Sequence, residues 1–241
     1  MNVPLRLAIN GAGGRMGQLL CALAVEDARF ELVAACTPAT DFAALTAIDV
    51  MVDFSAPAGL VRALAHCEKN GVALVSGTTG LDPGLQQRLD AAGQRIALLH
   101  AANFSLGMVL LSHLVAQAAA ILPGWDLEIL EAHHRAKRDA PSGTALALGQ
   151  AAANARGVEL DAVKAIERGG QRAPGAIGFA ALRAGDIVGE HSVLLATPGE
   201  RIELTHRATD RAIFARGALH AAVWIAGREP GRYGIDEMLA P

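Results

Sequence analysis

Two adjacent histidines and three basic side chains are crowded into residues 131–144, which read Glu-Ala-His-His-Arg-Ala-Lys-Arg-Asp-Ala-Pro-Ser-Gly-Thr. Histidine can exchange a proton near neutral pH, and lysine and arginine attract anions. Residues 126–131 alternate polar and apolar side chains as a half-buried strand does, and the residues from 145 onward are typical of a helix. A strand-to-helix connection gathers polar side chains and helix N–H groups around one small volume. We therefore expect a site for a small anion here.

Two other interpretations of this stretch need a test. A basic loop with histidines can be ordinary solvated surface, and His133 and His134 with Glu131 or Asp139 could instead belong to a metal-dependent hydrolase. Adjacent residues of a strand point to opposite faces, which argues against a chelating pair. We therefore predict no metal site. The isolated histidines are expected in the core or on the surface: His100, His113, His206 and His220.

Length and composition indicate a packed protein that acts on a small molecule. The 241 residues are 52% hydrophobic and 19% charged, enough for one large domain or two modest ones, and the net charge of -3 does not favour nucleic acid as a partner. Three cysteines outside any C-x-x-C pattern predict neither disulfides nor a thiolate metal site, and suit a reducing cytoplasm. Residues 106–122 are nearly all apolar, but polar interruptions and a length short of roughly 20 residues favour a buried helix over a membrane span.

A glycine-rich turn lies near the N-terminus. Residues 5–10 form an apolar run, residues 11–17 read Gly-Ala-Gly-Gly-Arg-Met-Gly, and helical apolar content follows. Such a turn lets the backbone approach a pyrophosphate, which the N-terminus of the next helix attracts. The match to G-x-G-x-x-G is imperfect, because Met16 stands at the third glycine position and Gly17 comes one place late. Its position at the first strand-helix junction favours dinucleotide binding.

The preference between NADH and NADPH stays open. Residues 30–36 are expected to form the second strand, whose end usually carries an acid for NADH or a nearby arginine for NADPH. Here the sequence is Cys36-Thr37-Pro38, with neither. Arg15 is a weak candidate for contact with a 2′-phosphate.

Alternating strands and helices predict a parallel sheet in the first part of the chain. Strands are expected at 49–54, 72–75 and 96–100, with helices at 58–70, capped by Gly71, and from Asp82-Pro83 onward. Only about a dozen residues separate the second and third strands, so the fold is trimmed there. Ligands of such sheets bind beyond the carboxyl ends of the strands, where residues 77–80 and 101–105 fall.

The pattern changes after residue 105. Residues 176–183, 190–197 and 201–207 read as strands in quick succession, and 211–227 as an amphipathic helix. We expect a Rossmann-like doubly wound α/β domain formed by 1–105 and 211–241, and a second α+β domain with an open mixed sheet formed by 106–210. The second domain would bind the substrate, and the family resemblance given below implies that it also mediates oligomerisation.

Five motifs together resemble one family over nearly the whole chain. They are residues 11–17, Gly77-Thr-Thr-Gly80, Ala101-Ala-Asn-Phe-Ser105, residues 131–144, and Arg183-Ala-Gly-Asp-Ile-Val-Gly-Glu-His191. They resemble the 4-hydroxy-tetrahydrodipicolinate reductases of the diaminopimelate route to lysine. The resemblance implies NAD(P)H-dependent reduction of 4-hydroxy-tetrahydrodipicolinate to tetrahydrodipicolinate with loss of water, by a cytoplasmic homotetramer.

The resemblance also implies roles for individual residues. His133 and Lys137 match the catalytic positions, and His134, Gly143 and Thr144 match those that bind the substrate carboxylates. The implied cofactor contacts are Gly11, Ala12, Gly13, Gly14, Arg15, Met16, Gly77, Thr78, Thr79, Ala101, Ala102, Asn103 and Phe104. The family's acidic and basic pair after the second strand is replaced by Thr37-Pro38. A non-enzymatic dinucleotide-binding sensor is a further possibility, but it would leave Lys137 and residues 141–144 without a role.

Overall fold

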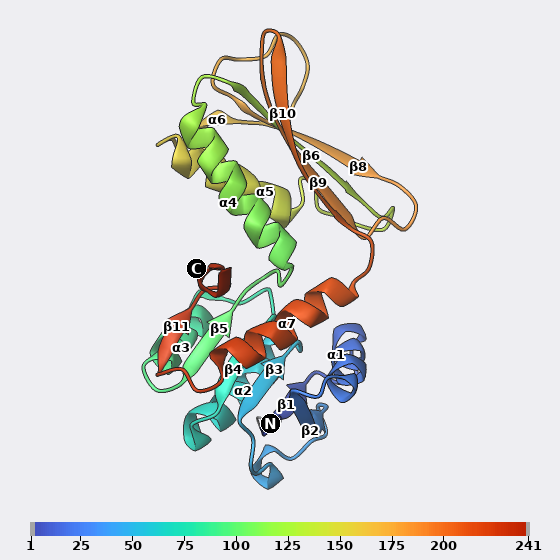
Figure 1. Cartoon of the computed structure of the whole chain (residues 1–241), viewed down its shortest axis with the longest axis vertical. Helices are drawn as coiled ribbons and strands as arrows, with labels where there is room; N and C mark the ends of the chain where they lie inside the picture. The colour runs from blue at the N-terminus through green and yellow to red at the C-terminus, as the bar shows by residue number, and fades with distance from the viewer. Residues whose placement is uncertain (1–2, 240–241) are drawn as a thin grey trace. The chain divides into compact units, whose positions relative to one another are not determined.

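The chain forms two compact units in the computed structural model, which describes residues 3–239 (Figure 1). Unit 1 comprises Met1–Ser105 and Ala212–Pro241, and unit 2 comprises Leu106–Arg211. The sequence placed the second boundary at residue 211 rather than 212. Each unit has its own sheet and its own helices.

Unit 1 contains a six-stranded parallel sheet in the order β11-β5-β4-β3-β1-β2. The strands are β1 (Leu5–Asn10), β2 (Phe30–Cys36), β3 (Val50–Asp53), β4 (Ala73–Ser76), β5 (Ala97–His100) and β11 (Gly231–Tyr233). Every neighbouring pair runs parallel, so the predicted Rossmann-like sheet is confirmed. β1 has β2 on one side and β3 on the other, which makes the carboxyl ends of these strands the switch point where ligands bind.

Helices cover both faces of this sheet. α1 (Arg15–Glu26) packs with α7 (Ala212–Ile225), and α2 (Pro57–Asn70) packs with α3 (Pro83–Gly93) (Figure 1). Local signals set their ends: Gly71 adopts φ 67° after α2, and the Asp82 carboxylate accepts a hydrogen bond from the Leu85 N–H at 2.8 Å. The 3-10 helix η1 (Phe42–Ala44) is the helical element between β2 and β3, and a second one, η2, spans Asp236–Leu239.

Unit 2 contains a five-stranded mixed sheet in the order β10-β9-β6-β8-β7. Its strands are β6 (Asp126–His133), β7 (Lys164–Ala165), β8 (Ile177–Arg183), β9 (Gly189–Thr197) and β10 (Glu200–Ala208). β9 runs antiparallel to β6 and β10, whereas β8 runs parallel to β6 and β7. The predicted α+β unit with a mixed sheet is therefore confirmed.

One face of this second sheet is covered by α4 (Leu106–Ile121) and α5 (Gly143–Ala155) (Figure 1). The short α6 spans Leu160–Val163. The core between sheet and helices includes Leu111, Val115, Ile129, Leu148, Phe179, Val193 and Leu195. On the opposite face Leu130 and Leu182 are exposed, Leu182 to 63%. This outer face is thus apolar in part and is not covered by a helix of the unit.

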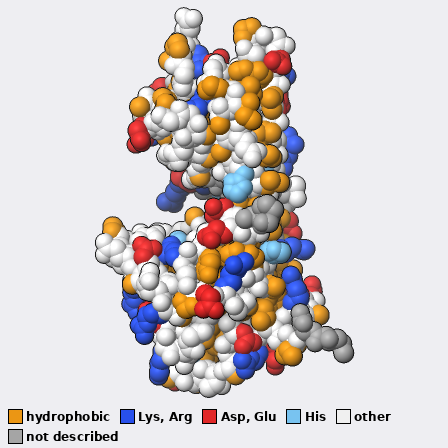
Figure 2. Space-filling model, turned by 60° about the vertical axis from the view of Figure 1, so that its left-hand side comes forward, with side chains coloured by type: hydrophobic (Ala, Val, Ile, Leu, Met, Phe, Trp, Pro, Cys, Tyr) orange, Lys and Arg blue, Asp and Glu red, His pale blue; other side chains and the backbone are white. Residues whose placement is uncertain are grey.

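The prediction that residues 106–122 form a buried helix is correct only for one face of α4. Met108, Leu111, Val115 and Ala119 are buried, but Leu110, Leu114 and Ile121 are exposed. Figure 2 shows hydrophobic side chains on the visible face of both units, with acidic and basic side chains among them. Within residues 3–239, no helix has the length and apolar content needed to cross a membrane.

Asp53 ties together the carboxyl ends of the strands of unit 1. It is fully buried at the end of β3, and its carboxylate accepts hydrogen bonds from four side chains. They come from Asn10 at 2.7 Å, Ser55 at 2.5 Å, Ser76 at 2.8 Å and Thr78 at 2.7 Å. Removing this carboxylate would leave the buried hydroxyls of Ser76 and Thr78 without their acceptor, and each unpaired buried donor costs about 1–3 kcal/mol.

We therefore expect Asp53→Ala to lower the midpoint of thermal unfolding by about 6 °C or more, which corresponds to a loss of roughly 3 kcal/mol. Differential scanning calorimetry measures this shift. Asp90→Ala is the matched control, because Asp90 lies in an exposed ion pair with Arg232, of a kind that contributes at most about 1 kcal/mol. Equal midpoints for the two variants would contradict the structural role of Asp53.

Candidate active site and cofactor cavity

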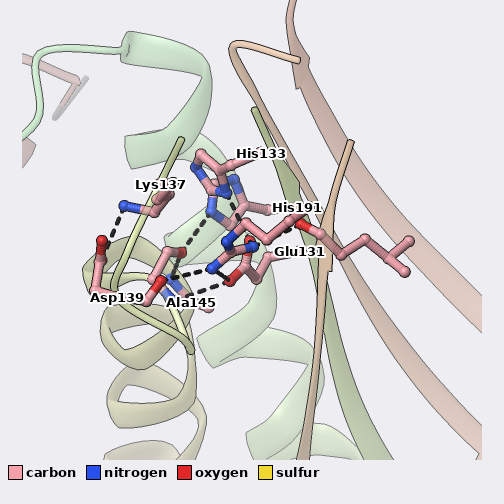
Figure 3. Close-up of polar contacts among 9 residues, drawn as sticks. Glu131, His133, Lys137, Asp139, Ala145 and His191 are labelled. Atoms are coloured by element: carbon pink, nitrogen blue, oxygen red, sulfur yellow. Dashed lines mark hydrogen bonds and ion pairs between the residues drawn. The ribbon is translucent and has the colours of Figure 1, made fainter. Parts of the chain in front are cut away.

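A buried carboxylate is the centre of the polar cluster in unit 2. The alternation of β6 places Glu131 and His133 on the same face as the core residue Ile129. Glu131 is 2% exposed. Its Oε2 lies 2.6 Å from His133 Nδ1 and 2.8 Å from Arg183 Nη1, and its Oε1 accepts from Arg183 Nη2 at 2.7 Å and from the Ser142 N–H at 3.1 Å (Figure 3).

These partners keep Glu131 ionised. Burial alone would raise the pKa of this carboxyl, but the hydrogen bonds from Arg183 and His133 outweigh it and hold the pKa below its ordinary value. An ionised carboxylate only accepts hydrogen bonds, so His133 Nδ1 carries a proton and donates it. His133 Nε2 is then the ring nitrogen left for chemistry. A Cβ at Gly189 would lie 3.1 Å from this nitrogen, so glycine at 189 keeps space beside it.

A second histidine contacts the residue that caps the start of α5. His191 of β9 pairs with Glu131 in the sheet register, and its Nε2 lies 3.1 Å from Ser142 Oγ. The same hydroxyl accepts the Ala145 N–H at 3.1 Å and so caps α5. The His191 and His133 rings meet edge to face, with centroids 5.1 Å apart. Burial, aided by the nearby His133, lowers the pKa of His191 to about 4, so His191 is neutral at pH 7.

Lys137 lies on the loop between β6 and α5. Its Nζ donates to Asp139 Oδ2 at 2.8 Å, and its side chain is 21% exposed against 60% for Asp139. Figure 3 shows the Lys137 side chain pointing toward Asp139. The loop is held by backbone bonds from the Lys137 N–H to the His134 carbonyl at 3.0 Å and from the Arg135 N–H to the Gly185 carbonyl at 3.2 Å. Asp139, named above only as a possible metal ligand, is thus the partner of the lysine, and its hydrogen bond with Lys137 lowers the pKa of the Asp139 carboxyl.

The five predicted catalytic and substrate-binding residues all lie between the end of β6 and the first turn of α5. His133 ends β6, His134 follows it, Lys137 is on the loop, and Gly143 and Thr144 begin α5. A Cβ at Gly143 would have no atom within 4 Å, so the space in front of this helix start is open.

The sequence predicted no role in this cluster for Arg183 and His191. It offered Glu131 only as a possible metal ligand and Ser142 only as part of the helix start. For Glu131 a signal existed, because residues 131 and 133 of one strand must share a face. For His191 and Arg183 only the sheet pairing brings them to Glu131. The described part of the chain has no group of three or more His, Cys, Asp or Glu side chains placed to hold a metal ion.

Unit 1 contains a cavity of about 630 Å³ at the carboxyl ends of β1, β2 and β3. Gly11, Gly13 and Gly14 line one side of it. The other lining residues are Asn10, Thr37, Pro38, Phe54, Ser55, Ala56, Ala58, Gly59 and Arg62. The cavity has the position and the glycine-rich wall that a dinucleotide requires.

The glycines of this wall have separate structural reasons. A Cβ at Gly11, whose φ is 86°, would lie 2.5 Å from the Phe54 carbonyl oxygen, and one at Gly17 would lie 2.0 Å from the Gly11 carbonyl oxygen. Gly17 therefore allows the close approach of helix and turn that the third glycine of the fingerprint provides, although it comes one place late. A Cβ at Gly13 would meet nothing within 4 Å, so this glycine leaves space open.

The other predicted cofactor residues lie at or behind this edge of the sheet. Thr78 is buried and bonds Asp53, and Phe104 is 1% exposed and packs on Phe54 with ring centroids 5.4 Å apart. Gly77 contacts the Phe54 ring, and the Asn103 side chain accepts the Ser105 N–H at 2.9 Å. None of these four predicted residues lines the cavity, and neither do the remaining predicted contacts: Ala12, Arg15, Met16, Thr79, Ala101 and Ala102.

The lowered pKa of His191 predicts how stability depends on pH. The unfolded state takes up a proton near pH 6.5 and the folded state only near pH 4, so stability is complete above pH 6.5 and is lost as the pH falls. Between pH 7 and pH 5 the wild type should lose about 2 kcal/mol through this residue, and His191→Gln should lose that much less. Thermal unfolding at both pH values measures the difference. Parallel losses in the two proteins would contradict a buried neutral His191.

Both halves of the chain match known proteins. The family profile described as dihydrodipicolinate reductase, N-terminus, matches residues 5–104, and that described as dihydrodipicolinate reductase, C-terminus, matches residues 107–239. The 4-hydroxy-tetrahydrodipicolinate reductase of Stenotrophomonas maltophilia strain K279a is 47% identical over 252 residues, covering 98% of each chain. That of Alkalilimnicola ehrlichii is 48% identical over 262 residues, covering 97% of this chain and 98% of the other.

A solved structure shows the same fold. Dipicolinate-bound dihydrodipicolinate reductase from Paenisporosarcina sp. TG-14 superposes with a TM-score of 0.81 at 24% identity, covering 98% of this chain and 99% of that one. The two profiles together span nearly all of residues 5–239, and the relatives match over their full length. The chain therefore belongs to the dihydrodipicolinate reductase family.

Proposed function

We propose that this chain reduces 4-hydroxy-tetrahydrodipicolinate to tetrahydrodipicolinate, with loss of water, in the diaminopimelate route to lysine. The observation that supports this most directly is the cluster of unit 2, in which Glu131 fixes His133 beside Lys137 and the open start of α5. The relatives that are nearly half identical over their full length carry the name of this activity.

The substrate is a small dicarboxylate, so its site needs cations and N–H donors. Lys137 supplies a cation, and the start of α5 at Gly143 and Thr144, together with His134, supplies donors for a carboxylate. Lys137 pairs with Asp139, whose side chain is 60% exposed. A substrate carboxylate can therefore reach this lysine and replace the aspartate as its partner.

The reaction consumes one hydride and one proton and releases water. A bound NADPH or NADH supplies the hydride. Lys137 donates the proton to the substrate, and His133, whose Nδ1–H is held by Glu131, presents Nε2 to position the substrate or share in the transfer. Arg183 balances the charge of Glu131 in both states of the histidine, so the carboxylate stays ionised throughout.

Two further properties belong to the proposal. The cavity of unit 1 binds the dinucleotide, with Gly11, Gly13 and Gly14 at its pyrophosphate. The chain works in the cytoplasm as a homotetramer that joins the outer faces of the unit 2 sheets. The exposed Leu130 and Leu182 on that face support the latter.

Lys137→Ala should lower kcat by roughly 100-fold or more, the scale of a positioned acid. The assay generates the unstable substrate in situ and follows NADH and NADPH oxidation separately. Arg138→Ala is the matched control, since it removes a neighbouring exposed cation and should leave kcat within about 3-fold of the wild type. Near-normal turnover of Lys137→Ala would remove the lysine from the chemistry. Binding of a dinucleotide without turnover in the wild type would favour a sensor.

Glu131→Gln should lower kcat by about 10-fold or more and raise KM for the substrate by a smaller factor, because Glu131 orients His133 and also holds the Ser142 N–H at the start of α5. Steady-state kinetics with both substrates varied separates the two constants. Glu159→Gln, an exposed change elsewhere in unit 2, is the control. A rise in KM with unchanged kcat would place Glu131 in substrate binding instead.

A further inference from the structure

A cationic side chain lines the cavity of unit 1, although residues 36–38 at the end of β2 include none. Arg62 of α2 is the one charged side chain among the described residues that line it. Ala58 and Gly59 line the cavity from the preceding turn of the same helix, because residues three and four apart share a helix face. The helix thus presents Arg62 beside Thr37 and Pro38, where an acid or an arginine would choose between the two dinucleotides.

The guanidinium of Arg62 is held in place by neutral groups. Nη1 donates to the Pro38 carbonyl at 2.9 Å and Nη2 donates to the Thr40 carbonyl, while the Phe42 ring lies 4.6 Å from the central carbon. These two bonds use two of the five N–H groups of the side chain. Within residues 3–239 Arg62 forms no ion pair, and the nearby Asp41 carboxylate instead accepts the Ala43 N–H and caps η1. The guanidinium group is therefore held in one position, and no carboxylate neutralises its charge within the described residues.

We propose that Arg62 binds the 2′-phosphate of NADPH and makes NADPH the preferred cofactor. The inference rests on the proposed placement of the dinucleotide in this cavity and deepens it. A 2′-phosphate is a dianion that a fixed guanidinium recognises through charge-assisted hydrogen bonds. The ribose 2′-hydroxyl of NADH is instead usually held by a carboxylate, and the lining of the cavity contains none in the described chain. Helix α2 thus supplies the cation that is missing after strand β2.

Binding measurements test this independently of turnover. Dissociation constants for NADPH, NADH, 2′,5′-ADP and 5′-AMP are measured by calorimetry for the wild type, Arg62→Ala, Arg62→Lys and Lys69→Ala. The wild type should bind NADPH more tightly than NADH and 2′,5′-ADP more tightly than 5′-AMP. Arg62→Ala should weaken NADPH and 2′,5′-ADP by roughly 10- to 100-fold, the range of a charge-assisted bond, and NADH and 5′-AMP by less than about 3-fold.

The other two variants separate charge from structure. Arg62→Lys should retain part of the preference, and Lys69→Ala, which removes an exposed cation from the last turn of the same helix, should match the wild type. Equal weakening of both dinucleotides in Arg62→Ala would show that Arg62 only holds residues 38–40 and would overturn the proposal, as would a wild type that prefers NADH. If the wild type bound neither dinucleotide, the proposed function itself would fail.

Discussion

The carboxylate of Glu131 is the contact on which the site of unit 2 depends. It lies on strand β6 and contacts Arg183 at the end of β8 and the Ser142 N–H at the start of α5. Arg183 also donates to the Asp139 carbonyl at 2.6 Å, so the carboxylate is linked to the loop that carries Lys137. A buried ion is stable only when its charge and lone pairs are all satisfied. The same requirement therefore positions His133, the loop and the helix start together.

Asp53 is the corresponding buried carboxylate of unit 1, and its hydrogen-bond partners are of a different kind. Its donors are neutral side chains from the ends of β1 and β4 and from the residues after β3 and β4, so the carboxylate is buried without a cation. The hydrogen bonds fix the loops that follow these strands. Ser55, one of these partners, lines the cavity directly. In both units a buried carboxylate thus makes the loops around a site rigid, which is what a preorganised site requires.

Much of the fold could be predicted because its local signals agree. Residues 30–36 were predicted as a strand with the bounds that β2 has, Gly71 and Asp82 cap the helices that their types indicate, and Ser142 begins α5. The errors have physical causes. β7, β11 and α6 are two to four residues long, too short for a periodic pattern, and the apolar face of α4 that remains exposed cannot be distinguished from a buried one by composition.

The candidate site divides in the same way. The sequence by itself determined the residue types at 131–144, the strand before them and the helix after them, because strand alternation and helix caps are local properties. Only the tertiary structure decided that His191 and Arg183 meet Glu131, that Gly17 takes over the role of the third glycine, and that Arg62 stands beside Thr37 and Pro38. These contacts join residues up to 60 positions apart, as Glu131 and His191 are, and pairing across a sheet or between a helix and a strand end leaves no periodic trace in the sequence.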